Sequence, residues 1–397
     1  MKFTEMKIDQ RILKALHEMG FIECTDIQAR TTPIGLEGKD LIGQAMTGSG
    51  KTAAFGIPLI QKMEPKKGVQ GLVLTPTREL AEQDYAEIVK FSKYCNVHAC
   101  TVYGGVAIDP QIMKIRNSEI VVGTPGRVMD HMQRGTLSLR GIKILVLDEG
   151  DRMLDMGFID DIRKIISQTP HSRQTMLFSA TMPDPIIHLA RNYLKNPVHI
   201  KTQSQISEHL LKHYYYDVRR DEKASILKHL IDKEKPHLAI VFTATRRAAD
   251  FVDRYLQSQG IESRSLHGGH TQATRTSILE GFHRGKPHIL IATDVAARGL
   301  DIKNVSHIFN YDVPNGPEEY THRVGRTARF GKTGISITLV CKEDHPSFQR
   351  IVRYMDIEKL DLGAFKPTPT RSMHSYEDRG GFGHRGGGGF RRPRRRY

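Results

Sequence analysis

Tryptophan is absent from this chain of 397 residues, and cysteine is rare. The four cysteines (Cys24, Cys95, Cys100 and Cys341) include no C-x-x-C pair, which argues against a cysteine-rich zinc site and a disulfide scaffold. We therefore expect reduced thiols in a cytoplasmic protein and no structural metal ion. The sequence also lacks any run of about 20 apolar residues, the length that spans a bilayer, and residues 1–10 carry no apolar segment typical of a signal peptide.

The chain contains fewer acidic than basic residues, with 44 Asp and Glu against 59 Lys and Arg. The resulting net charge of +15 and the isoelectric point near 9.6 suit a polyanionic partner, although a basic balance alone is weak evidence for nucleic acid. The chain is long enough for two domains of common size, and its hydrophobic content of 39% can fill their cores.

A glycine-rich loop, Ala-Met-Thr-Gly-Ser-Gly-Lys-Thr at residues 45–52, follows a short, mostly apolar stretch. Such a loop directs backbone N–H groups at the phosphates of a nucleoside triphosphate, and the helix that it opens adds its positive N-terminus. Ala45 stands where the general pattern has its first glycine, and taken alone the stretch is also compatible with a solvated turn. We expect Lys51 to bind the β- and γ-phosphates and the hydroxyl of Thr52 to bind Mg²⁺. The residues expected to line the nucleotide are Thr47, Gly48, Ser49, Gly50, Lys51 and Thr52.

An acidic pair, Asp148 and Glu149, directly follows the apolar stretch from Ile144 to Leu147. A strand that is apolar on both faces is typical of a buried parallel sheet, and open α/β sheets bind ligands at the carboxyl ends of such strands. We expect Asp148 to hold Mg²⁺ through water and Glu149 to orient the water that attacks the γ-phosphate. In isolation such a pair is more often a charged loop, but its place after a phosphate-binding loop favours the catalytic interpretation.

Short apolar segments alternate with longer amphipathic ones along the chain. Strands are expected at residues 71–75, 119–123, 175–179, 238–243, 288–292 and 307–311, and helices at residues 81–92, 225–232 and 246–259. This alternation predicts an α/β fold with parallel sheets and helices on both faces. Residues 201–213 are polar and divide the chain, and we place a linker at residues 203–210.

Beyond these motifs, the sequence resembles the DEAD-box RNA helicases from about Phe3 to about Asp361. The matching segments occur in the order of the family, although each would be an unremarkable turn or loop alone. They are Gly20-Phe21 with Thr25 and Ile27-Gln28, Pro76 to Leu80, Gly104-Gly105, Thr124 to Arg127, Ser179-Ala180-Thr181, Gln272 with Arg275, Ala292 to Asp301, and His322 to Arg329. The resemblance implies two tandem RecA-like domains, at residues 1–202 and 211–363, that face one cleft.

The resemblance further implies that the protein uses ATP and Mg²⁺ and that both domains hold the nucleotide. It places adenine against a set of residues near the N-terminus, namely Phe3, Phe21, Thr25 and Gln28, and the ribose hydroxyls against Asp294. Arg326 and Arg329 would reach across as arginine fingers and complete a catalytic group with Lys51 and Glu149. By spacing alone, such arginines are more often part of a surface ion-pair cluster.

The resemblance also implies an RNA partner that is bound through its backbone, without regard to base sequence. Backbone amides, hydroxyls and guanidinium groups suit phosphate oxygens and sugars, and none of these motifs resembles a base-reading platform. The implied RNA-binding residues are Pro76, Thr77, Arg78, Gly105, Thr124, Gly126, Arg127, Arg275 and Thr293. Ser179 and Thr181 are implied to couple ATP hydrolysis to strand separation, and the core is expected to be monomeric.

Two positions depart from the family pattern. Gly150 replaces the alanine of the Asp-Glu-Ala-Asp tetrapeptide, and the loss of a methyl group loosens the backbone beside Glu149. Cys24 stands where proline is usual, which makes the adenine-binding turn less rigid. We expect an RNA-dependent ATPase that separates short RNA duplexes or remodels RNA–protein complexes. The alternative is a nucleotide-gated RNA clamp or chaperone in which Gly150 has weakened hydrolysis.

Residues 364–397 are expected to form a separate tail. From Arg379 to Tyr397 the chain holds seven arginines and seven glycines, no acidic residue, and the aromatic residues Phe382, Phe390 and Tyr397. Such a composition cannot build a core, and arginine and aromatic groups without fixed geometry suit nonspecific RNA binding. A purely solubilising tail is the alternative.

Overall fold

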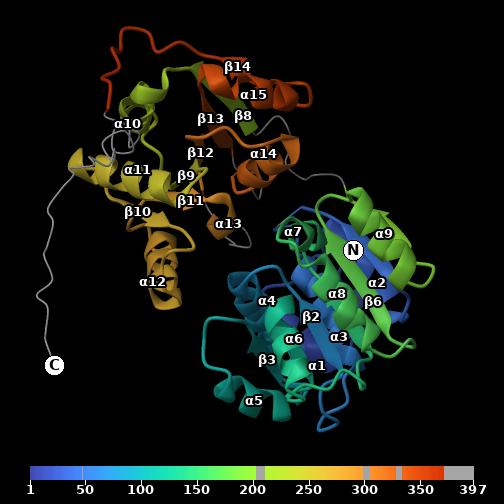
Figure 1. Ribbon diagram of the computed structural model, residues 1–397. Helices are drawn as coiled ribbons and strands as arrows, with labels where there is room; N and C mark the ends of the chain where they lie inside the picture. Colours follow the sequence, from blue (N-terminus) through green and yellow to red (C-terminus); the bar gives the residue numbers. More distant parts are fainter. Residues whose placement is uncertain (47, 203–210, 298–304, 328–332, 371–397) are drawn as a thin grey trace, which may run out of the picture.

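The computed structural model describes residues 1–46, 48–202, 211–297, 305–327 and 333–370. Within them the chain forms two seven-stranded sheets. One sheet belongs to an N-terminal lobe (residues 1–202) and the other to a C-terminal lobe (residues 211–370), and Figure 1 shows the two lobes. The strand pairings in both sheets are parallel. The predicted α/β fold with parallel sheets is therefore confirmed, whereas the linker expected at residues 203–210 lies outside the described residues.

The N-terminal sheet has the strand order β3-β4-β2-β5-β6-β1-β7. Its strands are β1 (Leu41–Gln44), β2 (Gly71–Leu74), β3 (Ala99–Val102), β4 (Ile120–Gly123), β5 (Ile144–Leu147), β6 (Gln174–Ser179) and β7 (Val198–Lys201). Parallel neighbours need crossover connections, which here are helices on both faces of the sheet. The helices are η1 (Phe3–Glu5), α1 (Gln10–Glu18), α2 (Asp26–Leu36), α3 (Lys51–Lys62), α4 (Arg78–Phe91), α5 (Asp109–Arg116), α6 (Pro125–Gln133), α7 (Gly150–Asp155), α8 (Ile159–Ser167) and α9 (Asp184–Tyr193).

Strand β5 shows how this lobe builds two cores at once. Successive side chains of a strand point to opposite faces. Ile144 and Val146 join the core that α1 to α4 cover, whereas Leu145 and Leu147 join the core that α5 to α9 cover. All four residues are buried, so both layers fix the carboxyl end of β5, where the acidic pair begins.

The C-terminal sheet has the strand order β10-β11-β9-β12-β13-β8-β14. Its strands are β8 (Leu211–Asp217), β9 (Ala239–Thr243), β10 (Ser263–Leu266), β11 (Ile289–Thr293), β12 (His307–Asn310), β13 (Gly334–Val340) and β14 (Glu358–Lys359). The helices of this lobe are η3 (Arg220–Glu222), α10 (Lys223–Glu234), α11 (Arg246–Ser258), α12 (Gln272–His283), α13 (Asp294–Ala297), α14 (Pro317–Val324), η4 (Lys342–Asp344) and α15 (His345–Val352). Residues of α10 and α11 share a core on one face of the sheet, and residues of α12 and α13 share a core on the other.

The strands predicted from the sequence agree with β2, β4, β6, β9, β11 and β12 to within one residue at each end. The helix predicted at residues 81–92 begins earlier, at Arg78, because the hydroxyl of Thr77 accepts a hydrogen bond from the N–H of Leu80 and caps α4. The apolar spacing alone carries no information on that cap. No helix among the described residues has both the length and the apolar character needed to cross a bilayer.

The packed structure does not end at Gly363, where the tail was predicted to follow. The ring of Phe365 stacks on His229 with 3.9 Å between the ring centroids, and the N–H of Thr370 donates to the carbonyl of Asp221 at 2.7 Å. Leu362 and Phe365 also pack against the core beside α10 and α11. Residues 364–370 are thus part of the C-terminal lobe, and the Arg/Gly-rich segment lies outside the described residues.

Candidate nucleotide and RNA sites

The glycine-rich loop joins β1 to the first turn of α3. Gly50 has φ of +92°, in the left-handed region, and an added Cβ there would lie 2.3 Å from Nε2 of Gln28. A side chain at this position would be strained by the left-handed conformation and would have to displace the amide of Gln28. Lys51 opens α3 and is 6% exposed; its Nζ donates to the carbonyl of Ala45 at 3.2 Å and lies 4.0 Å from Oδ1 of Asp148. Thr47 lies outside the described residues.

Two residues predicted to read adenine hold the carbonyls of this loop in the structure. Oγ1 of Thr25 donates to the carbonyl of Ser49 at 2.7 Å, and Nε2 of Gln28 donates to the carbonyl of Gly50 at 3.1 Å. Oε1 of Gln28 accepts from the N–H of Thr25, which completes a capping box at the start of α2. Both side chains therefore tie the N-terminal segment to the phosphate-binding loop.

The structure places Phe3 differently from the predicted adenine contact. Its side chain is 1% exposed, and its ring centroid lies 6.2 Å from that of Phe21. Phe21 is half-buried and meets Phe91 edge-on at 5.7 Å. The ring of Phe3 is therefore not accessible to a ligand in this structure. It packs against Phe21 within the core that α1 and α4 help to form, because burial of apolar surface is favourable.

The acidic pair occupies the expected end of β5 and is fully buried. Glu149 has φ of +51°, an uncommon conformation for a residue with a side chain, and its Oε2 accepts from Nη1 of Arg152 at 2.9 Å. Burial alone would raise the pKa of Glu149, but the charges of Arg152, Lys51 and Arg326 lower it below its ordinary value. Burial raises the pKa of Asp148 to about 6, and Lys51 opposes that rise. A carboxylate kept ionised beside cations suits the task of holding and polarising a water.

The same corner contains oxygen atoms that suit a magnesium ion. Oδ1 of Asp148 is buried and accepts no hydrogen bond from the described residues. The hydroxyl of Thr52 lies in the first turn of α3 and donates to Oδ1 of Asp84 at 3.0 Å. Carboxylate and hydroxyl oxygens are ligands that Mg²⁺ prefers, so these groups fit the metal that the sequence predicts.

Asp84, on α4, was not predicted as a site residue. It is 1% exposed, and its Oδ2 is buried without a hydrogen-bond partner among the described residues. Burial, with Asp148 as the second cause, raises the pKa of Asp84 well above its ordinary value. Its position was visible in the sequence, because Leu80, Ala81, Asp84 and Ile88 follow the spacing of one helix face and the other three are apolar.

A chain of contacts links the acidic motif to β6 and to the C-terminal lobe. The N–H of Asp151 donates to the hydroxyl of Ser179 at 3.1 Å, while the N–H and hydroxyl of Thr181 both donate to Oδ2 of Asp151, at 2.8 and 2.9 Å. The same carboxylate oxygen lies 3.8 Å from Nε2 of His322 on α14. Ser179 and Thr181 therefore meet Asp151 at a point where the lobes touch.

Gly150 does not leave a void in this motif. It has an ordinary backbone conformation at the start of α7, and an added Cβ would lie 2.8 Å from Cδ1 of Leu177. The side chain of Leu177 thus occupies the space of the missing methyl group. Glu149 and Asp151 keep their hydrogen bonds to Arg152 and Thr181 on either side of the glycine.

Among the arginines predicted to reach across, Arg326 lies at the lobe boundary and is 3% exposed. Its charge contributes to the lowered pKa of Glu149, so the two side chains are close in space although they belong to different lobes. Gly325, its neighbour, lies so near the phosphate-binding loop that an added Cβ would be 2.9 Å from Cε of Met46. Arg329 lies outside the described residues.

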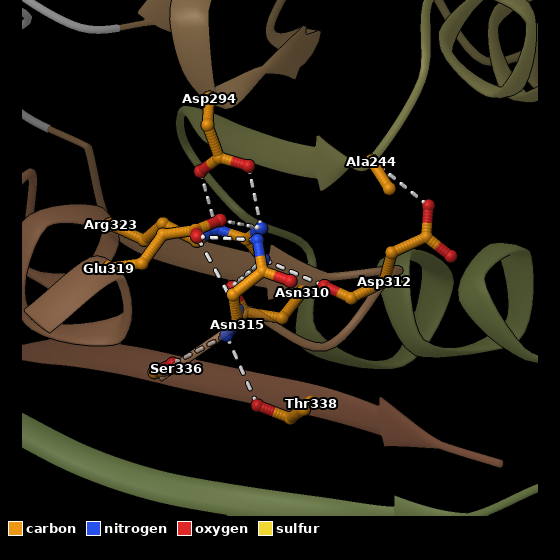
Figure 2. A network of polar contacts seen from close by, with 9 residues as sticks. All are labelled: Ala244, Asp294, Asn310, Asp312, Asn315, Glu319, Arg323, Ser336 and Thr338. Atoms are coloured by element: carbon orange, nitrogen blue, oxygen red, sulfur yellow. Dashed lines mark hydrogen bonds and ion pairs between the residues drawn. The ribbon is translucent and has the colours of Figure 1, made fainter. Parts of the chain in front are cut away.

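Asp294, predicted to bind ribose, is held by another residue in the structure (Figure 2). Nε and Nη2 of Arg323 donate to its two carboxylate oxygens, both at 2.7 Å. Arg323 also donates to Glu319 at 2.8 Å, to Oδ1 of Asn310 at 3.1 Å and to the carbonyl of Asp312 at 2.7 Å. Burial raises the pKa of Asp294 to about 6, against the effect of Arg323. Both oxygens of Asp294 are therefore engaged by an ion pair that the sequence interpretation did not include.

Seven of the nine predicted RNA-binding residues, drawn from both lobes, line one cleft of about 520 Å³, and Gly105 and Thr293 do not. The seven are Pro76, Thr77, Arg78, Thr124, Gly126, Arg127 and Arg275, joined by Gly104, Glu79 and Gln272. Thr77 and Thr124 stand at the N-termini of α4 and α6, where backbone N–H groups suit phosphate. Gly105 has φ of +79°, and an added Cβ would lie 2.2 Å from Nη1 of Arg78. Thr293 is buried at the end of β11 and does not line the cleft.

An ion pair between the lobes closes one side of this cleft. Nη2 of Arg275 lies 2.9 Å from Oε1 of Glu79, and Nε2 of Gln272 donates to the same oxygen at 3.2 Å. Glu79 is the charged residue of the Pro-Thr-Arg-Glu-Leu segment to which no role was assigned. The cleft therefore depends on both lobes, as a site that responds to their closure would.

Family comparisons agree with this division of the chain. Residues 25–189 match the family model described as DEAD/DEAH box helicase, and residues 222–331 match the model of the helicase conserved C-terminal domain. The ATP-dependent RNA helicase CshA of Listeria monocytogenes is 50% identical over 342 residues, which cover 85% of this chain and 66% of that protein. The DEAD-box ATP-dependent RNA helicase CshA of Bacillus subtilis is 44% identical over 362 residues, covering 90% of this chain and 73% of that protein.

The chain belongs to the DEAD/DEAH box helicase family. Among solved structures, the helicase resembles Saccharomyces cerevisiae Dbp5 bound to RNA and ADP BeF3, with a TM-score of 0.82 and 30% identity over 90% of this chain and 95% of that one. The two lobes of this DEAD/DEAH box helicase are thus tandem RecA-like domains, as the sequence resemblance implied. The chain spans 66% of the length of the Listeria relative, so that protein has sequence beyond the matched part.

Proposed function

We propose that this helicase is an RNA-dependent ATPase that uses ATP hydrolysis to separate short RNA duplexes or to remodel RNA–protein complexes. The names of its CshA relatives and the RNA-bound state of the Dbp5 structure support this proposal. The observation that carries it is the cleft between the lobes, because residues proposed to contact RNA come from both sides of it. RNA that fills this cleft would hold the two lobes together and so keep Arg326 beside the nucleotide site.

In the proposed mechanism, Lys51 and the loop at residues 45–50 bind the triphosphate, and Thr52 and Asp148 hold Mg²⁺. The metal neutralises charge on the phosphate oxygens when it is bound. Glu149, held ionised by Arg152, orients and polarises the attacking water. Arg326 stabilises the charge that develops on the transferred phosphoryl group, and we assign the same role to Arg329.

We propose that Phe21 contacts adenine and that Phe3 packs against Phe21 and supports it. Thr25 and Gln28 would connect adenine binding to the glycine-rich loop through their hydrogen bonds to its carbonyl groups. The engagement of Asp294 by Arg323 favours a supporting role for Asp294 over a ribose contact. We also propose a monomeric core, a cytoplasmic location consistent with four free thiols, and nonspecific RNA binding by the Arg/Gly-rich segment.

The decisive experiment measures ATP hydrolysis with and without single-stranded RNA. We expect RNA to stimulate turnover in the wild type and Lys51→Ala to lower it about a hundredfold or more, because a preorganised charge on the phosphates is lost. Lys62→Ala, at the exposed end of the same helix, is the matched control and should behave as wild type. Equal turnover with and without RNA would contradict the proposal.

The clamp hypothesis makes a different prediction, since it requires ATP-dependent RNA binding with negligible turnover. It rested on damage caused by Gly150, but Leu177 fills the space beside this glycine and the flanking carboxylates keep their partners. These observations favour the hydrolytic enzyme. Measured turnover well above that of Lys51→Ala would exclude the pure clamp.

A further inference from the structure

Asp84 is a buried carboxylate whose place in the site is not explained by the roles proposed so far. It belongs to the face of α4 that packs into the core, where its neighbours Leu80, Ala81 and Ile88 are apolar. Burying a carboxylate without full hydrogen bonding is costly, and such groups persist where a partner or a ligand compensates for them. The partner that the structure supplies is the hydroxyl of Thr52, at 3.0 Å.

A threonine hydroxyl has one proton to donate and two lone pairs to share. In the first turn of α3, that proton has a competing acceptor, because helical threonines commonly donate to the carbonyl four residues earlier. Asp84 takes the proton instead, from a different helix. With the proton directed at Asp84, the lone pairs of Thr52 face away from α4 and are free to bind a cation.

We propose that Asp84 is a positioning residue for the magnesium site: it fixes the hydroxyl of Thr52 in the orientation in which that oxygen ligates the metal. The inference rests on the proposed function, since it concerns the metal that accompanies ATP. Partners behind a metal ligand orient it and raise its basicity, and their loss commonly lowers metal affinity about 10- to 100-fold.

A second observation points to a cation at the same corner. Asp84 and Asp148 are 1% and 2% exposed, and each has one buried carboxylate oxygen without a hydrogen-bond partner among the described residues. Asp84 accepts from Thr52, and Oδ1 of Asp148 lies 4.0 Å from Nζ of Lys51, the residue before Thr52, so both carboxyl groups border the start of α3. Buried carboxyl oxygens that lack hydrogen bonds are costly unless a ligand completes them, and Mg²⁺ bound at Thr52 would do so.

The test measures binding of a fluorescent, non-hydrolysable ATP analogue as a function of Mg²⁺ concentration, including an EDTA sample. We expect Asp84→Leu to raise the Mg²⁺ concentration needed for half-maximal tightening about tenfold and to leave binding in EDTA unchanged or tighter. Asp84→Asn should stay within about threefold of wild type, because its amide oxygen still accepts the proton of Thr52. Asp84→Val repeats the test if leucine does not fit the site.

Two comparisons separate a positioning role from a general structural one. Thr52→Val should raise the Mg²⁺ requirement by itself, and adding Asp84→Leu should then have little further effect, because both changes act through one hydroxyl. Glu82→Gln removes a carboxylate from the same helix, where Glu82 accepts from Thr101, and should match wild type.

Three results would overturn the inference: an unchanged Mg²⁺ requirement in Asp84→Leu, additive effects in the double variant, or an equal loss of binding in EDTA. Failure of the wild type to bind the analogue at any Mg²⁺ concentration would instead reject the proposed function itself. The two failures are therefore distinguishable in one set of titrations.

Discussion

The two lobes treat the same residue type in opposite ways. Asp148 follows β5 in the N-terminal lobe, and Asp294 follows β11 in the C-terminal lobe, each at the carboxyl end of a buried parallel strand. Oδ1 of Asp148 is buried and accepts no hydrogen bond from the described residues. By contrast, Arg323 donates hydrogen bonds to both carboxylate oxygens of Asp294 (Figure 2). The place in the fold is shared, but only one of the two carboxylates is left open for a ligand.

This difference teaches that position at a strand end does not by itself assign a function. The N-terminal lobe leaves acidic groups incompletely paired, and this is tolerable if nucleotide and metal complete them. In the C-terminal lobe, Arg323 binds the carboxylates of Asp294 and Glu319, and Arg326 lies at the boundary with the other lobe. Substitutions should therefore impair chemistry in the first case and folding in the second, with Arg326 as the exception.

The largest effect is expected from that exception. Arg326→Ala should lower RNA-stimulated turnover about 10³-fold or more, because an arginine finger stabilises charge that exists only in the transition state. Nucleotide affinity should change only a few-fold, as measured with a fluorescent analogue. Arg350→Ala, an arginine of the same lobe that donates to Ser347, is the control. An unimpaired hydrolysis rate in Arg326→Ala would refute the role as an arginine finger. It would also mean that Arg326 is no exception among the residues of the C-terminal lobe.

The next largest effect, on stability, is expected when the ion pairs of Arg323 with Asp294 and Glu319 are removed. Arg323→Met leaves Asp294 and Glu319 buried without their cation and should destabilise the C-terminal lobe by about 3–5 kcal/mol. Hydrogen exchange of peptides from each lobe separates this loss from the stability of the N-terminal lobe. Adding Asp294→Asn and Glu319→Gln to Arg323→Met should recover part of the lost stability, because the unpaired buried charges are then removed.

The matched change in the other lobe is Asp148→Asn, which removes a buried charge whose Oδ1 accepts no hydrogen bond from the described residues. It should leave hydrogen exchange of the N-terminal lobe unchanged or slower while Mg²⁺-dependent nucleotide binding weakens. Equal destabilisation by Arg323→Met and Asp148→Asn would abolish the distinction between an open and a closed carboxylate.

The smallest effect is expected at Gly150. Gly150→Ala introduces a methyl group 2.8 Å from Cδ1 of Leu177 and should cost about 1–3 kcal/mol of stability through overpacking, with turnover lowered only a few-fold. Adding Leu177→Val removes the opposing methylene and should restore both quantities. Thermal unfolding and ATPase rates check the pair, and a rise in turnover with Gly150→Ala alone would show that the glycine impairs catalysis after all.

The sequence predicted the sheets well because buried parallel strands are continuous apolar runs, as in Ile144 to Leu147. It also located the glycine-rich loop before α3, because Gly50 meets a conformational requirement of the turn that few other residues meet, and phosphate binding by Lys51 stays a prediction. Neither signal depends on distant parts of the chain. The same holds for the acidic pair, whose place at the end of a strand is a local property.

What the sequence did not reveal depends on pairings between distant segments. Arg323 on α14 meets Asp294 at the start of α13 only in the folded lobe, and the ring of Phe3 is buried against Phe21, which also meets Phe91. Asp84 is the intermediate case, since its spacing marked it as buried although its partner Thr52 could not be deduced. Burial can thus be predicted from periodicity, whereas the identity of a buried polar partner cannot.

The ion pair between Glu79 and Arg275 places an internal competitor for phosphate in the cleft that we propose binds RNA. In this structure, Arg275 is neutralised by a carboxylate of the facing lobe, and its Nε remains buried without a hydrogen bond from the described residues. A phosphate that takes Arg275 must displace Glu79, so binding exchanges one anion for another. If RNA binds here as proposed, its affinity would reflect the difference between two attractions, and weakly binding polyanions would not displace the carboxylate of Glu79.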